Sequence, residues 1–286
     1  MINKKRLIFK LLRFSGLPYL FREFVQKSQV SILLFHDISR ETAVQTFSYL
    51  SKKYNLIDLN DFLAACKNKD PTRIPKKAMI ITFDDGHIRN HELLPVIKQY
   101  RIPVTIFLCS GIVNTNRHYW FLFPHPTISD QTFKRMHNQE KLRLLEEAGF
   151  TPKTVFNAPQ ALTKEQIEEM KPYVNFQAHT QFHPCLPQCD DAEAWTEIAD
   201  DKETLESEFK LAINAIAYPN GDYSDRDIAF SQQAGYSCGL TVDFGFNTVH
   251  SDLFRLKRFD ANDTTDRNEL IVKASGLWGF LKKRIT

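Results

Sequence analysis

Residues 78–87 read AMIITFDDGH, an apolar run followed at once by two acidic residues and a glycine. A short, continuous apolar run of this kind is typical of a strand buried on both faces, as in a parallel sheet. Similar runs occur at residues 31–35, 104–109 and 174–178, and amphipathic helical patterns separate them. The alternation predicts an α/β fold with mostly parallel strands. The repeated unit suggests barrel-like closure, although the pattern alone does not distinguish a barrel from an open sheet.

The middle of the chain differs from this pattern. Residues 116–160 contain few strand signals, and residues 130–148 read as one long helix. We interpret this region as a helical insertion within one catalytic domain that spans residues 30–276. A basic amphipathic segment, residues 1–29, precedes the domain, and a basic tail, residues 277–286, follows it.

Composition excludes several classes of protein. The chain has 286 residues, of which 43% are hydrophobic, so it can bury a substantial core. A net charge of +3 is too mild to predict nucleic-acid binding, which needs a concentrated basic face. The five scattered cysteines favour a reducing compartment over a disulfide framework. Cys185 and Cys189 are close enough in sequence to bind a metal, but no second cysteine pair supports a structural zinc site.

The first 25 residues are apolar and basic. Charged residues interrupt the apolar stretch, so it fits neither a secretion signal nor a transmembrane helix, and we expect a cytoplasmic protein. Leu7, Leu11 and Phe14 recur at helical spacing beside several lysines and arginines. Such a helix suits the inner face of an anionic membrane as a peripheral contact. The alternative is a helix packed on the domain with its basic face in water.

Chemically reactive residues follow the predicted strands. Asp84 and Asp85 come directly after one strand, and His179 and His183 come after another. Adjacent carboxylates repel each other, and a divalent cation bound by one leaves the other free to accept a proton. Two imidazoles four residues apart can reach one metal, and two His with one carboxylate leave coordination positions open for catalysis. Each motif alone is weak evidence, because an Asp-Asp-Gly sequence is commonly a solvated turn.

Five segments together resemble the polysaccharide deacetylase family. Residues 82–86 (TFDDG) are similar to its first motif, and residues 179–184 (HTQFHP) to its second. Residues 217–221 (AYPNG) match the third motif in part. Residues 33–37 (LLFHD) and 161–170 resemble the opening strand and a later helix of exopolysaccharide-type members. The resemblance extends from about residue 30 to residue 276 and implies a distorted, partly open (β/α) barrel.

The resemblance also implies roles for individual residues. Asp84 would be the general base, while Asp85, His179 and His183 would hold one divalent metal ion. Zinc is the expected ion, with cobalt, nickel or manganese as alternatives. The backbone N–H of Asn220 would help to bind the oxyanion. Attack of water on an acetamide carbonyl would then release acetate and a free amine.

Two features of the family pattern are missing. Ala217 stands where the third motif often has an arginine that orients the base. Arg258 could supply that charge, or it could form an ordinary surface or structural ion pair. We find no late Leu-His motif, and His250 is the one histidine after His183. The sequence therefore leaves the proton donor for the leaving amine unassigned.

Three further residues are candidates for substrate or supporting contacts. His36 at a strand end is expected either to line the pocket or to be a hydrogen-bonded structural residue. His87 follows the first motif and is either a supporting contact or a surface residue at a helix start. Trp120 is able to stack on a sugar ring, with packing inside the insertion as the alternative.

These observations predict a metal-dependent hydrolase that removes N-acetyl groups from amino sugars. Its substrate would be an N-acetylated polysaccharide or the lipid-linked or nucleotide-linked precursor of one. One alternative is a hydrolase of another non-peptide amide, such as a cyclic imide or ureide. A second alternative, prompted by the missing arginine and histidine, is a carbohydrate-binding homologue without catalytic activity.

Overall fold

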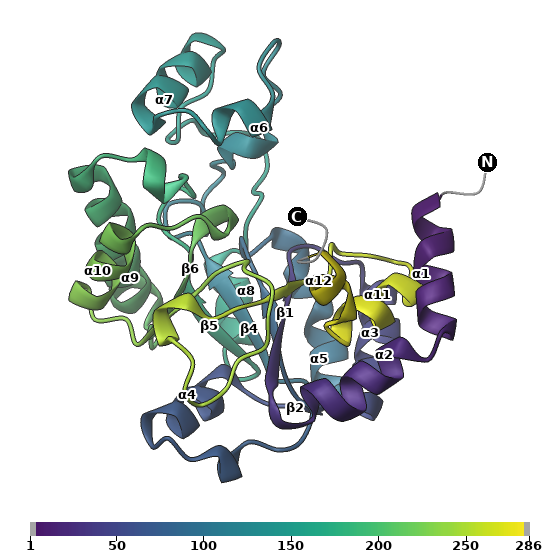
Figure 1. Cartoon of the computed structure of the whole chain (residues 1–286). Helices are drawn as coiled ribbons and strands as arrows, with labels where there is room; N and C mark the ends of the chain where they lie inside the picture. The colour runs from purple at the N-terminus through teal and green to yellow at the C-terminus, as the bar shows by residue number, and fades with distance from the viewer. Residues whose placement is uncertain (1–3, 283–286) are drawn as a thin grey trace.

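The computed structural model describes residues 4–282 and contains one parallel sheet surrounded by helices (Figure 1). The strands are β1 (Val30–Phe35), β2 (Asn55–Leu56), β3 (Ala78–Phe83), β4 (Val104–Leu108), β5 (Val174–Ala178), β6 (Ala215–Ala217), β7 (Cys238–Leu240) and β8 (Phe259–Asp260). The α-helices are α1 (Lys4–Phe14), α2 (Leu17–Leu20), α3 (Arg40–Lys53), α4 (Leu59–Lys67), α5 (Leu94–Tyr100), α6 (Asp130–Phe133), α7 (Asn138–Glu147), α8 (Lys164–Met170), α9 (Asp191–Phe209), α10 (Asp225–Gln233), α11 (Arg267–Ala274) and α12 (Leu277–Lys282).

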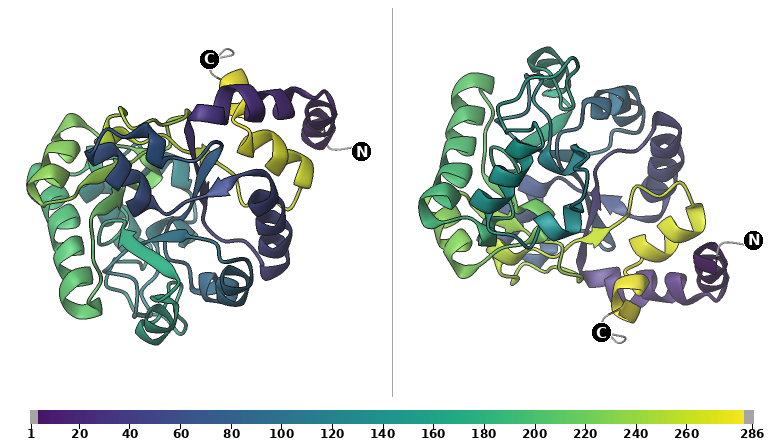
Figure 2. Two further views of the ribbon diagram at one scale, coloured as in Figure 1. Left: turned by 90° about the horizontal axis from the view of Figure 1, so that it is seen from below. Right: turned by 90° about the horizontal axis from the view of Figure 1, so that it is seen from above.

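The sheet runs in the order β7-β6-β5-β4-β3-β1-β8, with β2 paired to β3, and all its pairings are parallel. Seen along its axis, the sheet is curled and the helices lie around it (Figure 2). The end strands β7 and β8 are not paired with each other, and one isolated bridge joins Leu240 to Leu256 beside them. The predicted distorted, partly open (β/α) barrel is therefore confirmed.

Local sequence signals account for most of these elements. The apolar runs predicted as strands at residues 78–83 and 174–178 coincide with β3 and β5. Thr163 and Gln166 form a capping box at the start of α8, in which each side chain accepts a hydrogen bond from the other's backbone N–H. Strand burial and helix capping both depend on neighbouring residues, so they are visible in the sequence.

The insertion differs from its prediction as one long helix. It contains two separate helices, α6 and α7, because His137 has an extended backbone (φ −53°, ψ 136°) between them. The break lets α7 turn Asn138, Lys141 and Leu145 inward, and Leu145 joins a small apolar cluster with Trp120. In Figure 1 the two helices project from the rest of the molecule.

The two ends of the described chain pack together. Helix α1 lies along α11, and Phe9 is fully buried against Val272 and Leu277. The region predicted as a basic tail begins with helix α12, so its residues 277–282 are helical. Residues 1–3 of the predicted N-terminal segment and 283–286 of the tail lie outside the described residues. Within residues 4–282, no helix combines the length and apolar character that a membrane span needs.

Candidate active site and metal centre

The carboxyl ends of four neighbouring strands meet at one cavity of about 360 Å³. Asp84 and Asp85 follow β3, while His179 and His183 follow β5. His36 follows β1, the strand beside β3, and Asn220 follows β6, the strand beside β5. All six line the cavity, because parallel strands deliver the residues that follow them to the same edge of a sheet.

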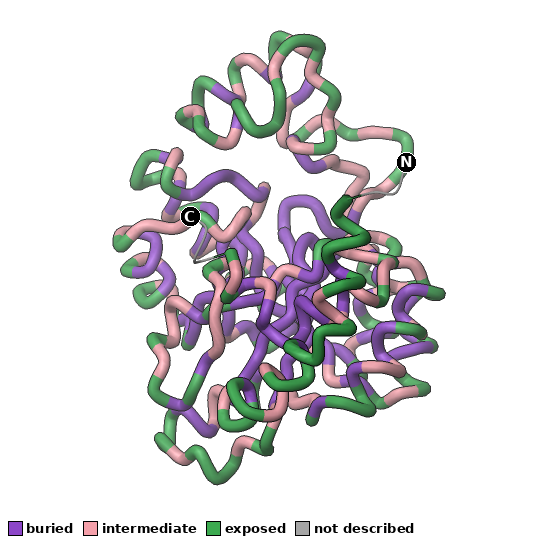
Figure 3. The backbone as a smooth tube through the Cα atoms, turned by 45° about the vertical axis from the view of Figure 1, so that its right-hand side comes forward, coloured by how far each residue is buried: buried purple, intermediate pink, exposed green. Residues whose placement is uncertain are grey.

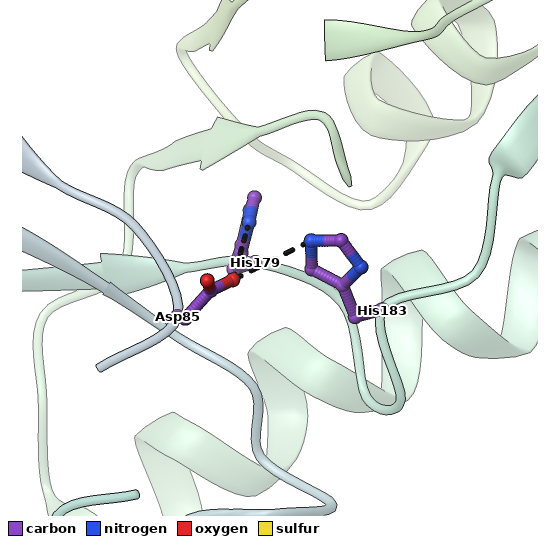
Figure 4. A group of neighbouring side chains, drawn as sticks. All are labelled: Asp85, His179 and His183. Atoms are coloured by element: carbon purple, nitrogen blue, oxygen red, sulfur yellow. Dashed lines mark ion pairs between the residues drawn. The ribbon is translucent and has the colours of Figure 1, made fainter. Parts of the chain in front are cut away.

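Asp85, His179 and His183 point toward one another (Figure 4). One carboxylate oxygen, Oδ1 of Asp85, lies 3.4 Å from Nε2 of His179 and 3.4 Å from Nε2 of His183. One potential ligand atom from each residue lies within 4.8 Å of the other two. Two ligands at zinc-ligand distances and a tetrahedral angle are about 3.3 Å apart. The spacing of this cluster therefore fits a single divalent ion.

Hydrogen bonding supports the same interpretation. Nδ1 of His179 lies 2.7 Å from the carbonyl oxygen of Ala217, which directs Nε2 toward Asp85. Oδ1 of Asp85 and Nδ1 of His183 are buried without a hydrogen-bond partner among the described residues. An unsatisfied buried carboxylate oxygen is costly unless a cation or a proton occupies the space beside it.

The charges of the cluster also suit a metal. Burial lowers the pKa of His183 to about 3, so this imidazole is neutral at physiological pH. Burial alone would raise the pKa of Asp85, but the hydrogen bond with His179 and the charges of both imidazoles lower it. Burial opposes and the charge of Asp84 favours protonation of His179, whose pKa is raised. A cation that binds here would displace that proton.

Asp84 is held by a different partner. The guanidinium of Arg258 binds both of its oxygens, with Nη1–Oδ1 at 2.7 Å and Nη2–Oδ2 at 2.8 Å. Burial would raise the pKa of Asp84, but the positive charge of Arg258 outweighs it and lowers the pKa. Asp84 is thus a buried, ionised carboxylate beside the cluster, and its Oδ2 lies 3.9 Å from Nε2 of His179.

Arg258 reaches the site from the open edge of the barrel. It directly precedes β8, it is fully buried, and its Nε donates to the carbonyl oxygen of Thr241 just beyond β7. Its side chain therefore spans the gap between the two end strands. Of the two expectations for Arg258, the structure places its charge on Asp84, and the pair is buried rather than on the surface.

The backbone around the site is strained. Asp85, Thr180, His183 and Asn220 are non-glycine residues with positive φ angles of 70°, 65°, 57° and 57°. Such conformations are uncommon for L-residues and persist where the surrounding structure enforces them. Gly221, at φ 76°, packs so closely on Val242 that any side chain there would collide with it. The strain concentrates in the loops that aim the metal-ligand candidates and Asn220.

His36 lies in the same cavity and is fixed by Asp263. The backbone N–H of His36 donates to Oδ1 of Asp263 at 2.8 Å, and its Nδ1 lies 3.5 Å from Oδ2. Burial alone would lower the pKa of His36. The hydrogen bond to Asp263 and the charges of Asp85 and Asp84 instead raise it to about 9. The side chain is 42% exposed, so a protonated imidazole is accessible from the cavity.

The other predicted residues take different places. Asn220 lines the cavity, and its side-chain amide donates to the sulfur of Cys185 at 3.3 Å. His87 caps the 3₁₀ turn after the first motif, with its Nδ1 3.6 Å from Asp37, and it does not line the cavity. Trp120 is buried behind the site, where its Nε1 donates to the carbonyl oxygen of His183 at 2.8 Å.

Several cavity residues were not identified from the sequence. Phe121, beside Trp120, packs its ring 4.7 Å from that of His183, and Lys134 at the end of α6 also lines the cavity. Phe244 and Asp260 complete the wall near the open edge of the barrel. The strand-end position of Asp260 and the adjacency of Phe121 to Trp120 were the available signals. Lys134 had none, because its approach depends on how the insertion folds over the sheet.

The chain matches known proteins over most of its length. The model of the polysaccharide deacetylase family matches residues 72–239, more than half of the chain. YxkH of Bacillus subtilis (strain 168), whose name places it among the polysaccharide deacetylases, is 23% identical over 198 residues. The match covers 68% of this chain and 54% of YxkH, so the chain spans about half the length of this relative.

Solved structures share the fold. Streptococcus pyogenes deacetylase PplD, in complex with acetate, gives a TM-score of 0.60 at 23% identity and covers 81% of this chain and 92% of its own. IcaB from Ammonifex degensii gives 0.61 at 19% identity, covering 87% and 97%. A polysaccharide deacetylase from Bacillus cereus gives 0.61 at 18% identity, covering 87% and 69%. With this fold and the family match, the chain belongs to the polysaccharide deacetylase family.

Proposed function

We propose that the protein is a metal-dependent hydrolase that removes N-acetyl groups from amino sugars of a polysaccharide or its lipid-linked or nucleotide-linked precursor. One observation carries the proposal: an ionised carboxylate, Asp84, lies beside a separate three-residue cluster with metal-ligand spacing in one cavity. This division provides a base that is not consumed as a ligand. Family membership and the names of the structural relatives support an acetylated glycan as the substrate.

Asp85, His179 and His183 would hold the ion, for which zinc is the first candidate and cobalt, nickel or manganese are alternatives. A divalent ion there would polarise the acetamide carbonyl and make the attacking water more acidic. The rest of the chemistry falls to the protein's own groups, and the backbone N–H of Asn220 is proposed to bind the developing oxyanion.

Asp84 is proposed to accept the proton of the attacking water. Its two hydrogen bonds to Arg258 keep the carboxylate ionised and fix its orientation. Arg258 would act through Asp84, as a positioning residue, and would compensate for Ala217, where the family often has an arginine. A base oriented in this way contributes roughly 10²–10⁴-fold to the rate of an acyl-transfer reaction.

His36 is proposed to donate the proton to the leaving amine. With its pKa raised to about 9, it is protonated at neutral pH. Asp263 fixes the imidazole from one side, and the side chain borders the same cavity as Asp84. An amine leaves from the tetrahedral intermediate far more readily when it is protonated, so an acid on the cavity wall meets a chemical requirement of the reaction.

The test is acetate release from N-acetylglucosamine oligomers by metal-loaded protein, with a cyclic imide as the comparison substrate. We expect acetate release without imide opening, and we expect Asp84→Asn to lose roughly 10²–10⁴-fold in kcat/KM while it keeps its bound metal. Asp61→Asn, which changes an exposed carboxylate on α4, is the matched control and should retain full activity. Full activity of Asp84→Asn would refute the assignment of the base.

A further inference from the structure

The exposed apolar side chains of this protein are concentrated near its N-terminus. Of thirteen large hydrophobic residues exposed in the described chain, nine lie between residues 7 and 25. Four of them, Leu7, Ile8, Leu11 and Phe14, form one side of α1 at helical spacing, which we call the outer stripe. Leu11 is 64% exposed and Phe14 is 70% exposed. In Figure 3 the helix is coloured almost entirely as exposed. Concentrated apolar exposure of this kind marks an interaction surface.

The opposite side of α1 is already occupied by the catalytic domain. The ring of Phe9 lies 4.7 Å from that of Trp278, and Phe9 is fully buried. Lys5 forms a 3.0 Å ion pair with Glu269, and Nη1 of Arg13 donates to Asn268 at 2.9 Å. The helix is therefore attached through one side, and the outer stripe is not left exposed by a detached helix.

The outer stripe is bordered by positive charge. Residues 4–22 contain no acidic side chain, and Glu23 is paired with Arg22 and Lys77. Lys4 and Lys10 are exposed, and no ion pair to either occurs within residues 4–282. The acidic residues of the underlying α11 region are engaged by Lys5 and by Arg6, whose Nε lies 4.0 Å from Asp266. The exposed side of α1 is thus both apolar and cationic.

We propose that α1 docks on a lipid surface that carries anionic headgroups. The outer stripe would enter the interface between headgroups and acyl chains, and Lys4 and Lys10 would contact the headgroups. The stripe stands on a convex helix rather than in a groove, which suits a soft lipid interface better than an interlocking protein surface. Because the other side of α1 is fixed to the domain, docking would also orient the cavity relative to the lipid surface. This proposal does not depend on the deacetylase activity.

The experiment is sedimentation of the full chain with two kinds of vesicle, one of phosphatidylcholine and one containing 30% phosphatidylglycerol. We expect binding to the anionic vesicles, weak binding to the neutral ones, and a loss of binding as salt is raised. The double variant Leu11→Gln and Phe14→Gln should reduce partitioning roughly tenfold or more, because two inserting side chains are removed. Gln is also a good helix former, so α1 should be retained.

The matched control is Val155→Gln and Tyr173→Gln, which alters two exposed hydrophobic residues, 69% and 46% exposed, outside the N-terminal region. It should bind anionic vesicles as the parent does. Equal binding by the Leu11 and Phe14 variant, or no binding by the folded parent, would overturn the proposal. A lipid-free dimer that this variant abolishes, seen by light scattering, would also overturn it and would identify a second copy of the chain as the occupant.

Discussion

Replacing Arg258 with Met should destabilise the protein strongly, and the loss should depend on Asp84. Met fills much of the same volume but removes the charge from a site where Arg258 is fully buried and Asp84 is 4% exposed. The two hydrogen bonds at 2.7 and 2.8 Å are lost with it. Asp84 would then be a buried carboxylate without its main counter-charge, and burial would raise its pKa.

The expected magnitude follows from the burial of the pair. Removing one partner of a buried ion pair costs about 3–5 kcal/mol, because the other charge stays desolvated. Asp84→Asn should be destabilising for the same reason, with the charge left on Arg258. The double variant should cost less than the sum of the two, since neither unpaired charge remains. The lost bond from Arg258 to Thr241 is common to the single and the double variant, so it cancels in the comparison.

The assay is urea unfolding of the four proteins with metal chelated, because an ion bound at Asp85 would add its own binding energy. We expect a coupling energy of at least about 2 kcal/mol between positions 84 and 258. Arg89→Met is the control: Arg89 pairs with Asp37 while 51% exposed, and its loss should cost less than about 1 kcal/mol. Additive effects of the two buried changes, within about 0.5 kcal/mol, would refute the reasoning.

Three further predictions concern metal and pH. Chelation should lower the melting temperature of the parent but not of Asp85→Asn, since an ion at 100 times its Kd stabilises by about 2.7 kcal/mol; equal shifts in both would count against the cluster. Because the pKa of His36 is raised to about 9, activity should fall on the alkaline side near that pH, and Asp263→Asn should move this limb to lower pH in a kcat/KM profile; an unmoved limb would exclude His36 as the acid. Burial raises the pKa of Glu197 to about 8, so the folded state holds a proton that the unfolded state releases, and stability should fall by up to about 1.4 kcal/mol per pH unit between about pH 5 and 8. Glu197→Gln should flatten that dependence in urea unfolding at pH 6 and pH 8, and an unchanged slope would argue that Glu197 ionises normally.

Chain-local features were predictable because their causes are local. The apolar run that forms β3 and the capping box that starts α8 each involve residues a few positions apart. Boundaries failed where packing made the choice. The segment at residues 130–148 has helical periodicity throughout, yet the chain breaks it at His137 so that α7 can bury its own apolar side.

The candidate site divides in the same way. Its residue types and their places after strands are visible in the sequence, which is why Asp84, Asp85, His179 and His183 are grouped by their motifs alone. The partners that set their charge are not visible there, since Arg258 is 174 residues from Asp84, and Asp263 is 227 residues from His36. Nothing in the neighbourhood of either residue specifies its partner.

The sequence by itself therefore determined the fold class, the strands and the chemical types available at their ends. Only the tertiary structure decided that Arg258 bridges the open edge of the barrel to Asp84, that Asp263 holds His36, and that α1 buries Phe9 while its outer stripe stays exposed. The physical reason is that strand and helix formation respond to neighbours along the chain. The charge state and exposure of a side chain depend instead on which distant segments fold against it.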